Sequence, residues 1–205
     1  MKKIYGADSF RKEIEDFCAS MHESNQELKV EIYKNAVIYP YKERHLNGNK
    51  IGEGGVFDCN GQPIELSKQK DDEAKVSIDL PKDCNDLKNC QFIDEDAVFL
   101  GMVHTHFGHF ITQSMSRLWA YVLRYELDLF NKKAVYIGIS DSYFVKVFEM
   151  LGIKKNNIMR VSVPTKFRSV VIAQEEQLIY GSTFHKSYNE TFNYIRVTGG
   201  VGILA

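Results

Sequence analysis

Three histidines, His104, His106 and His109, lie within six residues of one another, between an apolar run and a helix-like pattern. Imidazole is a common zinc ligand, and it also exchanges a proton near pH 6.5, so it can bind a metal or act as a general acid or base. Their spacing leaves both chemistries open. A third interpretation is that His109 is simply a polar residue in the first turn of a helix.

As a metal site, the stretch HTHFGH resembles the HxHxDH signature of metallo-β-lactamase-type hydrolases, which also follows a strand. Gly108 stands where that signature has aspartate, so a ligand for a second metal is missing, and His185 is the only later histidine. Three imidazoles can still hold one zinc ion with an open coordination position. A metal-dependent hydrolase is therefore an alternative function.

The residues after the histidines have the period of an amphipathic helix over Phe110–Phe130. One predicted face is apolar and carries Ile111, Met115, Leu118, Val122 and Tyr125. The other is polar and carries His109, Gln113, Ser116, Arg117 and Arg124. The positive end of a helix dipole attracts anions, so His109 and Arg117 could both meet a phosphate or a developing negative charge. Equally, Arg117 could be an ordinary solvated side chain.

Strands and helices alternate in the predicted structure after Asp94. The patterns indicate strands at 97–103, 134–139, 158–161 and 169–173, and helices at 110–130 and 141–151. This alternation is typical of βαβ units, and ligands of open α/β sheets bind beyond the carboxyl ends of the strands, where His109 would lie. We therefore predict an α/β fold with a Rossmann-like parallel sheet, preceded by a small β-rich segment.

Residues 1–92 are the predicted β-rich segment, with a helix near 10–21, a strand over 28–39 and a short strand at 75–80. Asn60-Gly61 lies between apolar runs and predicts a type I′ hairpin turn. Residues 93–205 are the predicted Rossmann-like domain. A helix should begin near His185, but the chain then ends on a Gly-rich apolar tail, so we expect this domain to be truncated at its C-terminus.

Composition argues against several classes of protein. The net charge of -1 gives no electrostatic reason to expect a nucleic-acid partner. Four scattered cysteines without a CxxC pair indicate reduced thiols (Cys18, Cys59, Cys84 and Cys90). The chain starts without the apolar segment of a signal peptide, and no apolar run approaches the roughly 20 residues of a spanning helix. We therefore expect a cytoplasmic protein without a membrane span, which leaves peripheral attachment to the cytoplasmic membrane open.

Three short motifs occur in a suggestive order. Residues 54–61 read GGVFDCNG, residues 108–119 contain GHFI followed by RLW, and residues 134–161 form a strand, a helix, the letters LGI and another strand. In this order they resemble the family-61 glycosyltransferases, also described as capsular-polysaccharide biosynthesis proteins. Gln113 or Ser114 stands where an acidic residue is common in that family. The family's second, donor-binding domain has no counterpart in residues 180–205.

The resemblance implies an inverting transfer of sugar from a nucleotide-sugar donor to a glycan hydroxyl, in a two-domain GT-B architecture of which this chain would supply the N-terminal half. It makes His109 the candidate base, because a helix dipole keeps a nearby imidazole neutral and ready to accept a proton. Asp58 is a rival base, with a role as a turn residue as the alternative. The candidate substrate-binding residues are His106, Gly108, Gln113 and Arg117. No metal or cofactor is implied, and a non-catalytic glycan-binding remnant is a further alternative.

Overall fold

The computed structural model describes residues 22–24, 27–46, 49–70, 76–79, 90–103, 110–138, 144–175, 183–185 and 187–198. Its strands are β1 (His22–Ser24), β2 (Val30–Lys34), β3 (Val37–Leu46), β4 (Asn49–Phe57), β5 (Gln69–Lys70), β6 (Val76–Asp79), β7 (Gln91–Val103), β8 (Lys133–Gly138), β9 (Ile158–Arg160), β10 (Thr165–Ala173) and β11 (Thr183–His185). Its helical elements are η1 (Glu65–Ser67), η3 (Phe110–Ser114), α3 (Trp119–Leu123), η4 (Tyr125–Leu127), η5 (Leu129–Asn131), α4 (Phe144–Met150), η6 (Lys155–Asn157) and α5 (Ser187–Thr198).

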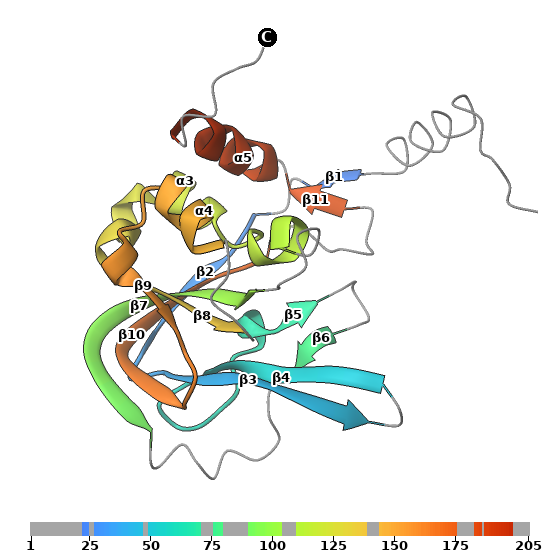
Figure 1. The fold of residues 1–205 in the computed structure, drawn as a ribbon, viewed down its shortest axis with the longest axis vertical. Helices are drawn as coiled ribbons and strands as arrows, with labels where there is room; N and C mark the ends of the chain where they lie inside the picture. The colour runs from blue at the N-terminus through green and yellow to red at the C-terminus, as the bar shows by residue number, and fades with distance from the viewer. Residues whose placement is uncertain are drawn as a thin grey trace, which may run out of the picture.

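Within these ranges one mixed sheet holds nine strands, in the order β5-β6-β4-β3-β10-β7-β8-β9, with β2 also paired to β10 (Figure 1). Strands β10, β7, β8 and β9 run parallel to one another. On the other side of β10, strands β3 and β4 run antiparallel. Strands from both sides of residue 92 therefore share one sheet. A separate parallel pair is formed by β1 and β11.

Strands β2 and β3 run along β10 as one interrupted strand. Residues 30–34 pair with 169–173, and residues 37–38 pair with 165–166. Between them Asn35 adopts a φ of 55°, a left-handed conformation that asparagine tolerates better than most residues. The Asn35 N–H donates to the Arg168 carbonyl at 2.9 Å, which continues the ladder across the interruption. The strand predicted over 28–39 is thus confirmed, with a bulge near its middle.

Successive side chains of the parallel strands point to opposite faces of the sheet, so they build two separate hydrophobic layers. The first layer joins strand residues to the helical elements and includes Val98, Leu100, Tyr136, Val171, Leu118, Trp119 and Phe148. The second layer joins the alternate strand residues to β3 and β4 and includes Ala97, Phe99, Val135, Ile137, Ile172, Ile38 and Val56. Among the described residues, α3 and α4 therefore cover the first face, whereas β3, β4 and Leu66 of η1 pack on the second.

Strands, not helices, cover the second face. In Figure 1, α3 and α4 lie above the parallel strands, while β3 and β4 pass below them. Gly54 of β4 lies directly against Ile137 of β8, because a Cβ at Gly54 would be only 2.6 Å from Ile137 Cδ1. The absence of a side chain at position 54 thus lets the sheet fold back over its own parallel part.

The predicted Rossmann-like parallel sheet, as half of a GT-B architecture, is wrong. The sheet is mixed, and its second face is covered by strands where a doubly wound fold has helices. The helices on the first face are short, with five residues in α3 and seven in α4. The strand–helix alternation after Asp94 predicted the parallel strands correctly. It could not show that β2–β4 would join the same sheet.

The single helix predicted over 110–130 is also wrong. A π-helical turn at η3 leads through turns to the five-residue helix α3, and two 3-10 turns follow. Each type of winding rotates side chains by a different angle, so the predicted polar and apolar faces do not persist. As a result, Gln113, Ser116 and Arg117 are buried, whereas Tyr125 is 77% exposed.

The other predicted elements have mixed outcomes. Strand β6 confirms the strand expected near 75–80, and α5 confirms the helix after His185. Gly152 follows α4 with a φ of 100°, as a helix-ending glycine should. The turn at Asn60-Gly61 exists, but type I′ is wrong, because only Gly61 has a positive φ and that type requires two such residues. The helix predicted at 10–21 and the Gly-rich tail lie outside the described residues.

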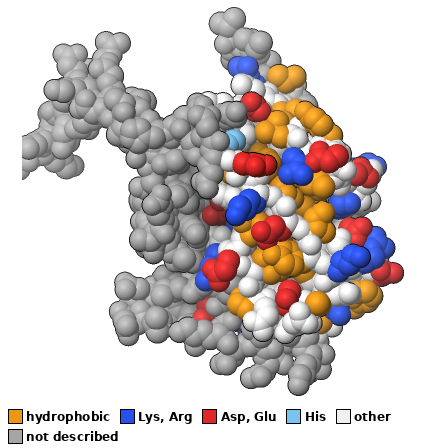
Figure 2. Space-filling model, turned by 180° about the vertical axis from the view of Figure 1, so that it is seen from behind, with side chains coloured by type: hydrophobic (Ala, Val, Ile, Leu, Met, Phe, Trp, Pro, Cys, Tyr) orange, Lys and Arg blue, Asp and Glu red, His pale blue; other side chains and the backbone are white. Residues whose placement is uncertain are grey.

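Of the helices that the structure describes, none has the length and apolar character required to cross a bilayer. Figure 2 shows one face of the molecule, on which basic and acidic side chains are interspersed around apolar ones. Pairs such as Arg168 and Asp96, with Nε and Oδ1 2.9 Å apart, bring both signs of charge together. Such a mixed distribution does not create a field of one sign on that face.

Candidate functional site

The carboxyl ends of the parallel strands are the natural place to look for a site. β7 lies between β8 and β10, so the chain runs outward from β7 to β8 and β9 and then returns to the other side of β7. Connections that diverge in this way leave a crevice between the carboxyl ends of two strands, and ligands of parallel sheets bind there. Residues 104–109 follow β7 at this edge, and residues 176–182 follow β10. Both segments lie outside the described residues.

Four of the predicted site residues, His104, His106, Gly108 and His109, belong to the first of these segments. Proton transfer by His109 and zinc binding by the three imidazoles both stay predictions. In the ranges that the structure covers, no group of three or more His, Cys, Asp or Glu side chains is arranged to hold a metal ion.

Arg117 is at the centre of the described part of this edge. Its side chain is 1% exposed, and its guanidinium donates to carbonyl groups of two distant segments. Nη1 donates to Leu66 O at 2.9 Å and also to Ala173 O, and Nη2 donates to Lys68 O at 2.8 Å. Nη2 also lies 3.4 Å from Glu175 Oε1. Arg117 therefore joins the end of β10 to the segment around η1.

The environment of Arg117 is that of a buried cation with protein partners. Burial lowers the pKa of the guanidinium, and the carboxylate of Glu175 opposes that effect. The Nε group has no hydrogen-bond partner among the described residues, and it faces Gly101, where a Cβ would lie 3.1 Å away. Arg117 is thus not a solvated side chain, and its two terminal nitrogens already donate to protein oxygens. Its position fits a structural role in which it holds the end of β10 and the segment around η1 together.

Trp119 strengthens the same connection. Its indole Nε1 donates to the Gln174 carbonyl at 2.8 Å, one residue beyond the Ala173 carbonyl that Arg117 binds. Gln113 is also buried, at 5% exposure, and its carbonyl accepts the Ser116 hydroxyl at 2.6 Å. The predicted substrate-binding residues Arg117 and Gln113 are therefore both interior. Arg117 and Trp119 of the RLW motif donate hydrogen bonds to the backbone at the carboxyl end of β10.

A pocket of about 370 Å³ opens at the same edge. Its lining comes from β3, from the end of β8 and from the end of β9: Pro40, Tyr41, Glu43, Gly138, Arg160, Val161 and Ser162. Gly138 pairs with Val103, the last residue of β7, so the pocket adjoins the point where residues 104–109 begin. The pocket combines an aromatic ring, a carboxylate, a guanidinium and a hydroxyl group.

Asp58 lies in a turn at the other end of the parallel strands. Its Oδ1 accepts the backbone N–H groups of Asn60 at 2.9 Å and Gln62 at 2.7 Å. Its carbonyl accepts the Gly61 N–H at 3.1 Å. These bonds are those of an aspartate that stabilises a turn from within, which agrees with the alternative role considered for it.

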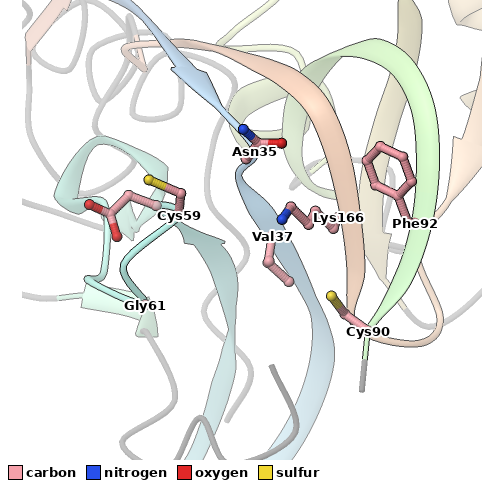
Figure 3. A pocket seen from close by; sticks show the side chains of 8 residues that line it. Asn35, Val37, Cys59, Gly61, Cys90, Phe92 and Lys166 are labelled. Atoms are coloured by element: carbon pink, nitrogen blue, oxygen red, sulfur yellow. The ribbon is translucent and has the colours of Figure 1, made fainter. Parts of the chain in front are cut away.

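Asp58 also lines a second pocket, of about 420 Å³ (Figure 3). The Cys59 side chain lies on the turn side, and Cys90 and Phe92 lie on the β7 side, with Val37 and Lys166 between them. Because Phe92 and Lys166 belong to the amino ends of β7 and β10, this pocket is remote along the strands from the carboxyl edge. The structure therefore does not bring Asp58 to the end of β7 from which residues 104–109 depart.

The motifs behind the family resemblance contain residues with defined packing roles. Gly54 lets β4 approach β8, while Gly55 and Gly61 adopt φ values of 142° and 77°. Arg117 and Trp119 hold the exit of β10. These positions explain how such motifs can serve a fold without contacting a ligand.

Sequence reasoning missed Glu43, Arg160 and Ser162 of this pocket. Arg160 carried a usable signal, since it is a charged residue at the carboxyl end of a predicted strand. Glu43 carried none, because its strand approaches β8 only through the long-range folding of the sheet.

No known family model matches this chain, and neither does any curated protein or solved structure. The resemblance to family-61 glycosyltransferases therefore stays a prediction that rests on the three motifs.

Proposed function

We propose that this chain is an inverting, metal-independent glycosyltransferase that moves a sugar from a nucleotide-sugar donor to a hydroxyl group of a glycan acceptor, with His109 as the general base. One observation supports the proposal: β7, the strand that precedes the three histidines in the sequence, ends beside a pocket whose side chains suit a sugar. Val103, the residue before His104, pairs with Gly138, which lines that pocket. The end of β7 and a cavity of the size of small-molecule sites are thus neighbours at the edge where parallel sheets bind ligands.

The proposed reaction requires few protein groups. His109 accepts the proton of an acceptor hydroxyl as that oxygen attacks the anomeric carbon of the donor. The bond from that carbon to the nucleoside diphosphate breaks, and its electrons leave with the diphosphate. N–H groups near the start of η3, together with His106, are the groups proposed to contact substrate. Arg117 acts as a positioning residue, because it holds the exit of β10 and the segment around η1 in fixed relation.

A transfer assay tests this proposal. The purified chain is incubated with a panel of nucleotide sugars and oligosaccharide acceptors, and both the glycoside product and the released nucleoside diphosphate are measured. We expect product with at least one pair, and a loss of at least 100-fold in His109→Ala, because a general base contributes about 10² to 10⁴ to a rate. His45→Ala, which changes a histidine on β3, is the matched control and should keep full activity.

Three results would contradict the proposal. The first is full activity in the His109→Ala variant. The second is glycan binding without transfer or nucleotide release, which identifies a non-catalytic binding protein. The third is one equivalent of zinc in the purified chain that is lost on His104→Ala or His106→Ala, which identifies the metal-dependent hydrolase.

A further inference from the structure

The carboxyl-edge pocket has walls that the fold holds rigidly. The Val161 N–H donates to the Tyr136 carbonyl at 2.9 Å, which fixes the chain between Arg160 and Ser162 against β8. At Gly138 a Cβ would lie 2.7 Å from the Val103 carbonyl, so glycine allows β7 and β8 to close together there. A cavity with such fixed walls loses little conformational freedom when it binds a ligand.

Two side chains of β3 form the opposite wall. Tyr41 and Glu43 both line the pocket from this strand. Tyr41 packs against the second hydrophobic layer and is half-buried, which leaves part of its ring to the pocket. Glu43 is exposed at the rim. The pocket therefore offers an apolar ring surface beside a carboxylate.

The chemistry of these groups matches a sugar with adjacent hydroxyl groups. A carboxylate can accept two hydroxyl protons at once, and a guanidinium presents several donors in one plane. An aromatic ring packs against the C–H face of a pyranose while its polar edge keeps water contacts. The volume of about 370 Å³ lies in the range of small-molecule sites.

The charges of the lining residues indicate whether the bound sugar is acidic or neutral. The lining residues carry one negative group, Glu43, and one positive group, Arg160. An acidic ligand would gain from Arg160 but would meet repulsion from Glu43, whereas a neutral ring meets no net charge.

From these features we infer that the pocket lined by Tyr41, Glu43, Arg160 and Ser162 binds one neutral pyranose unit of the acceptor, with vicinal hydroxyl groups directed to Glu43 and Arg160. This inference rests on the proposed function, since it names the acceptor class for the same edge of the sheet. It concerns binding alone and can be tested without any transfer.

Equilibrium titration of the chain with methyl glycosides, followed by ligand-observed NMR, tests the inference. The probes are the methyl glycosides of glucose, galactose and mannose, with methyl glucuronide as the acidic counterpart. We expect at least one neutral probe to bind at least tenfold more tightly than the glucuronide. Glu43→Gln and Tyr41→Leu should each weaken that binding at least tenfold, and the leucine keeps apolar contact with the layer beneath.

Matched controls come from the helices. Glu149→Gln on α4 and Arg196→Gln on α5 remove exposed charges of the same kind and should leave the affinity unchanged. Arg160→Gln should weaken neutral binding and should leave the glucuronide no stronger. The inference is overturned if no neutral probe binds, if the glucuronide binds as well as the neutral probes, or if Glu43→Gln binds like the wild type.

These results are separable from those of the transfer assay. Binding that depends on Glu43 without any release of nucleoside diphosphate keeps the pocket assignment and removes the proposed function. Transfer that is unaffected by Glu43→Gln and Tyr41→Leu keeps the function and removes the assignment.

Discussion

The two ends of the parallel strands use charge in opposite ways. In the amino-terminal parts of these strands, Arg168 and Asp96 pair on the surface, with 56% and 28% of their side chains exposed. At the carboxyl edge, Arg117 is almost fully enclosed and donates to carbonyls of two distant segments. Exposed pairs contribute little to stability because water screens them, whereas a buried cation is costly to leave without partners. Polar interactions should therefore stabilise the carboxyl edge more than the amino-terminal parts of these strands.

The largest effect should come from Arg117→Met. This change leaves the carbonyls of Leu66, Lys68 and Ala173 without their buried donor and removes the cation beside Glu175. Breaking a buried charged network of this kind costs about 3–5 kcal/mol of the free energy of unfolding. Urea denaturation followed by circular dichroism measures the loss. Arg196→Met is the control, and a midpoint for Arg117→Met equal to that of the control would remove Arg117 from its central role.

Gly101→Ala tests how closely the Arg117 side chain packs against the backbone of β7. Gly101 has a φ of 87°, and a Cβ there would lie 3.1 Å from Arg117 Nε. We expect a loss of about 1–3 kcal/mol from backbone strain and crowding together. Gly152→Ala is the matched control, because its φ is 100° but its Cβ would make only an ordinary 3.5 Å contact with Phe130. Thermal or urea midpoints that rank Gly152→Ala as equally harmful would show that Arg117 is not crowded.

The sequence predicted many of the individual strands correctly, but it did not predict how they pair with one another. Apolar runs correctly predicted β7, β8, β9 and β10, and in β7, β8 and β10 these runs are buried on both faces of the sheet. The pairing of β10 with β2 and β3 joins residues more than 120 positions apart, so no local pattern could reveal it. The fold class was wrong for that reason.

The candidate site was less predictable than the strands. A helical period placed Arg117 on the polar face of a single helix, whereas the chain begins with a π-helical turn at η3 and Arg117 is buried. Its partners at positions 66, 68 and 173 are distant in sequence, so its burial could be seen only in the folded chain. Asp58 was easier to interpret, because the bonds that hold it lie within four residues.

Trp119→Phe should lower the free energy of unfolding by less than Arg117→Met or Gly101→Ala does. The substitution removes the donor to the Gln174 carbonyl and costs about 1–2 kcal/mol. Tyr121→Phe is its counterpart on the same helix, since the buried Tyr121 hydroxyl has no partner among the described residues and burial raises its pKa. That change should slightly increase the free energy of unfolding. A loss for Tyr121→Phe as large as for Trp119→Phe would show that the indole bond is unimportant.

The smallest effect belongs to the exposed end, and it depends on pH. The hydrogen bond from Arg168 holds the pKa of Asp96 below its usual value. A carboxyl group with a lowered pKa stabilises the fold above its unfolded pKa of about 3.9, and this contribution disappears as the pH falls through the folded pKa. Asp96→Asn should therefore unfold at slightly lower urea than the wild type at pH 7. The two should converge as the pH falls through the folded pKa of Asp96, and a difference that grew in acid would contradict the assigned shift.

The claim on which this account depends is that a sugar binds at the carboxyl edge and not at the Asp58 pocket. Backbone amide chemical shifts of the labelled chain, recorded as a neutral methyl glycoside is added, distinguish the two ends directly. We predict shift changes at Tyr41, Gly138 and Arg160, with Asp58, Phe92 and Lys166 unmoved. Changes confined to Asp58, Phe92 and Lys166, or no changes at saturating glycoside, would contradict it.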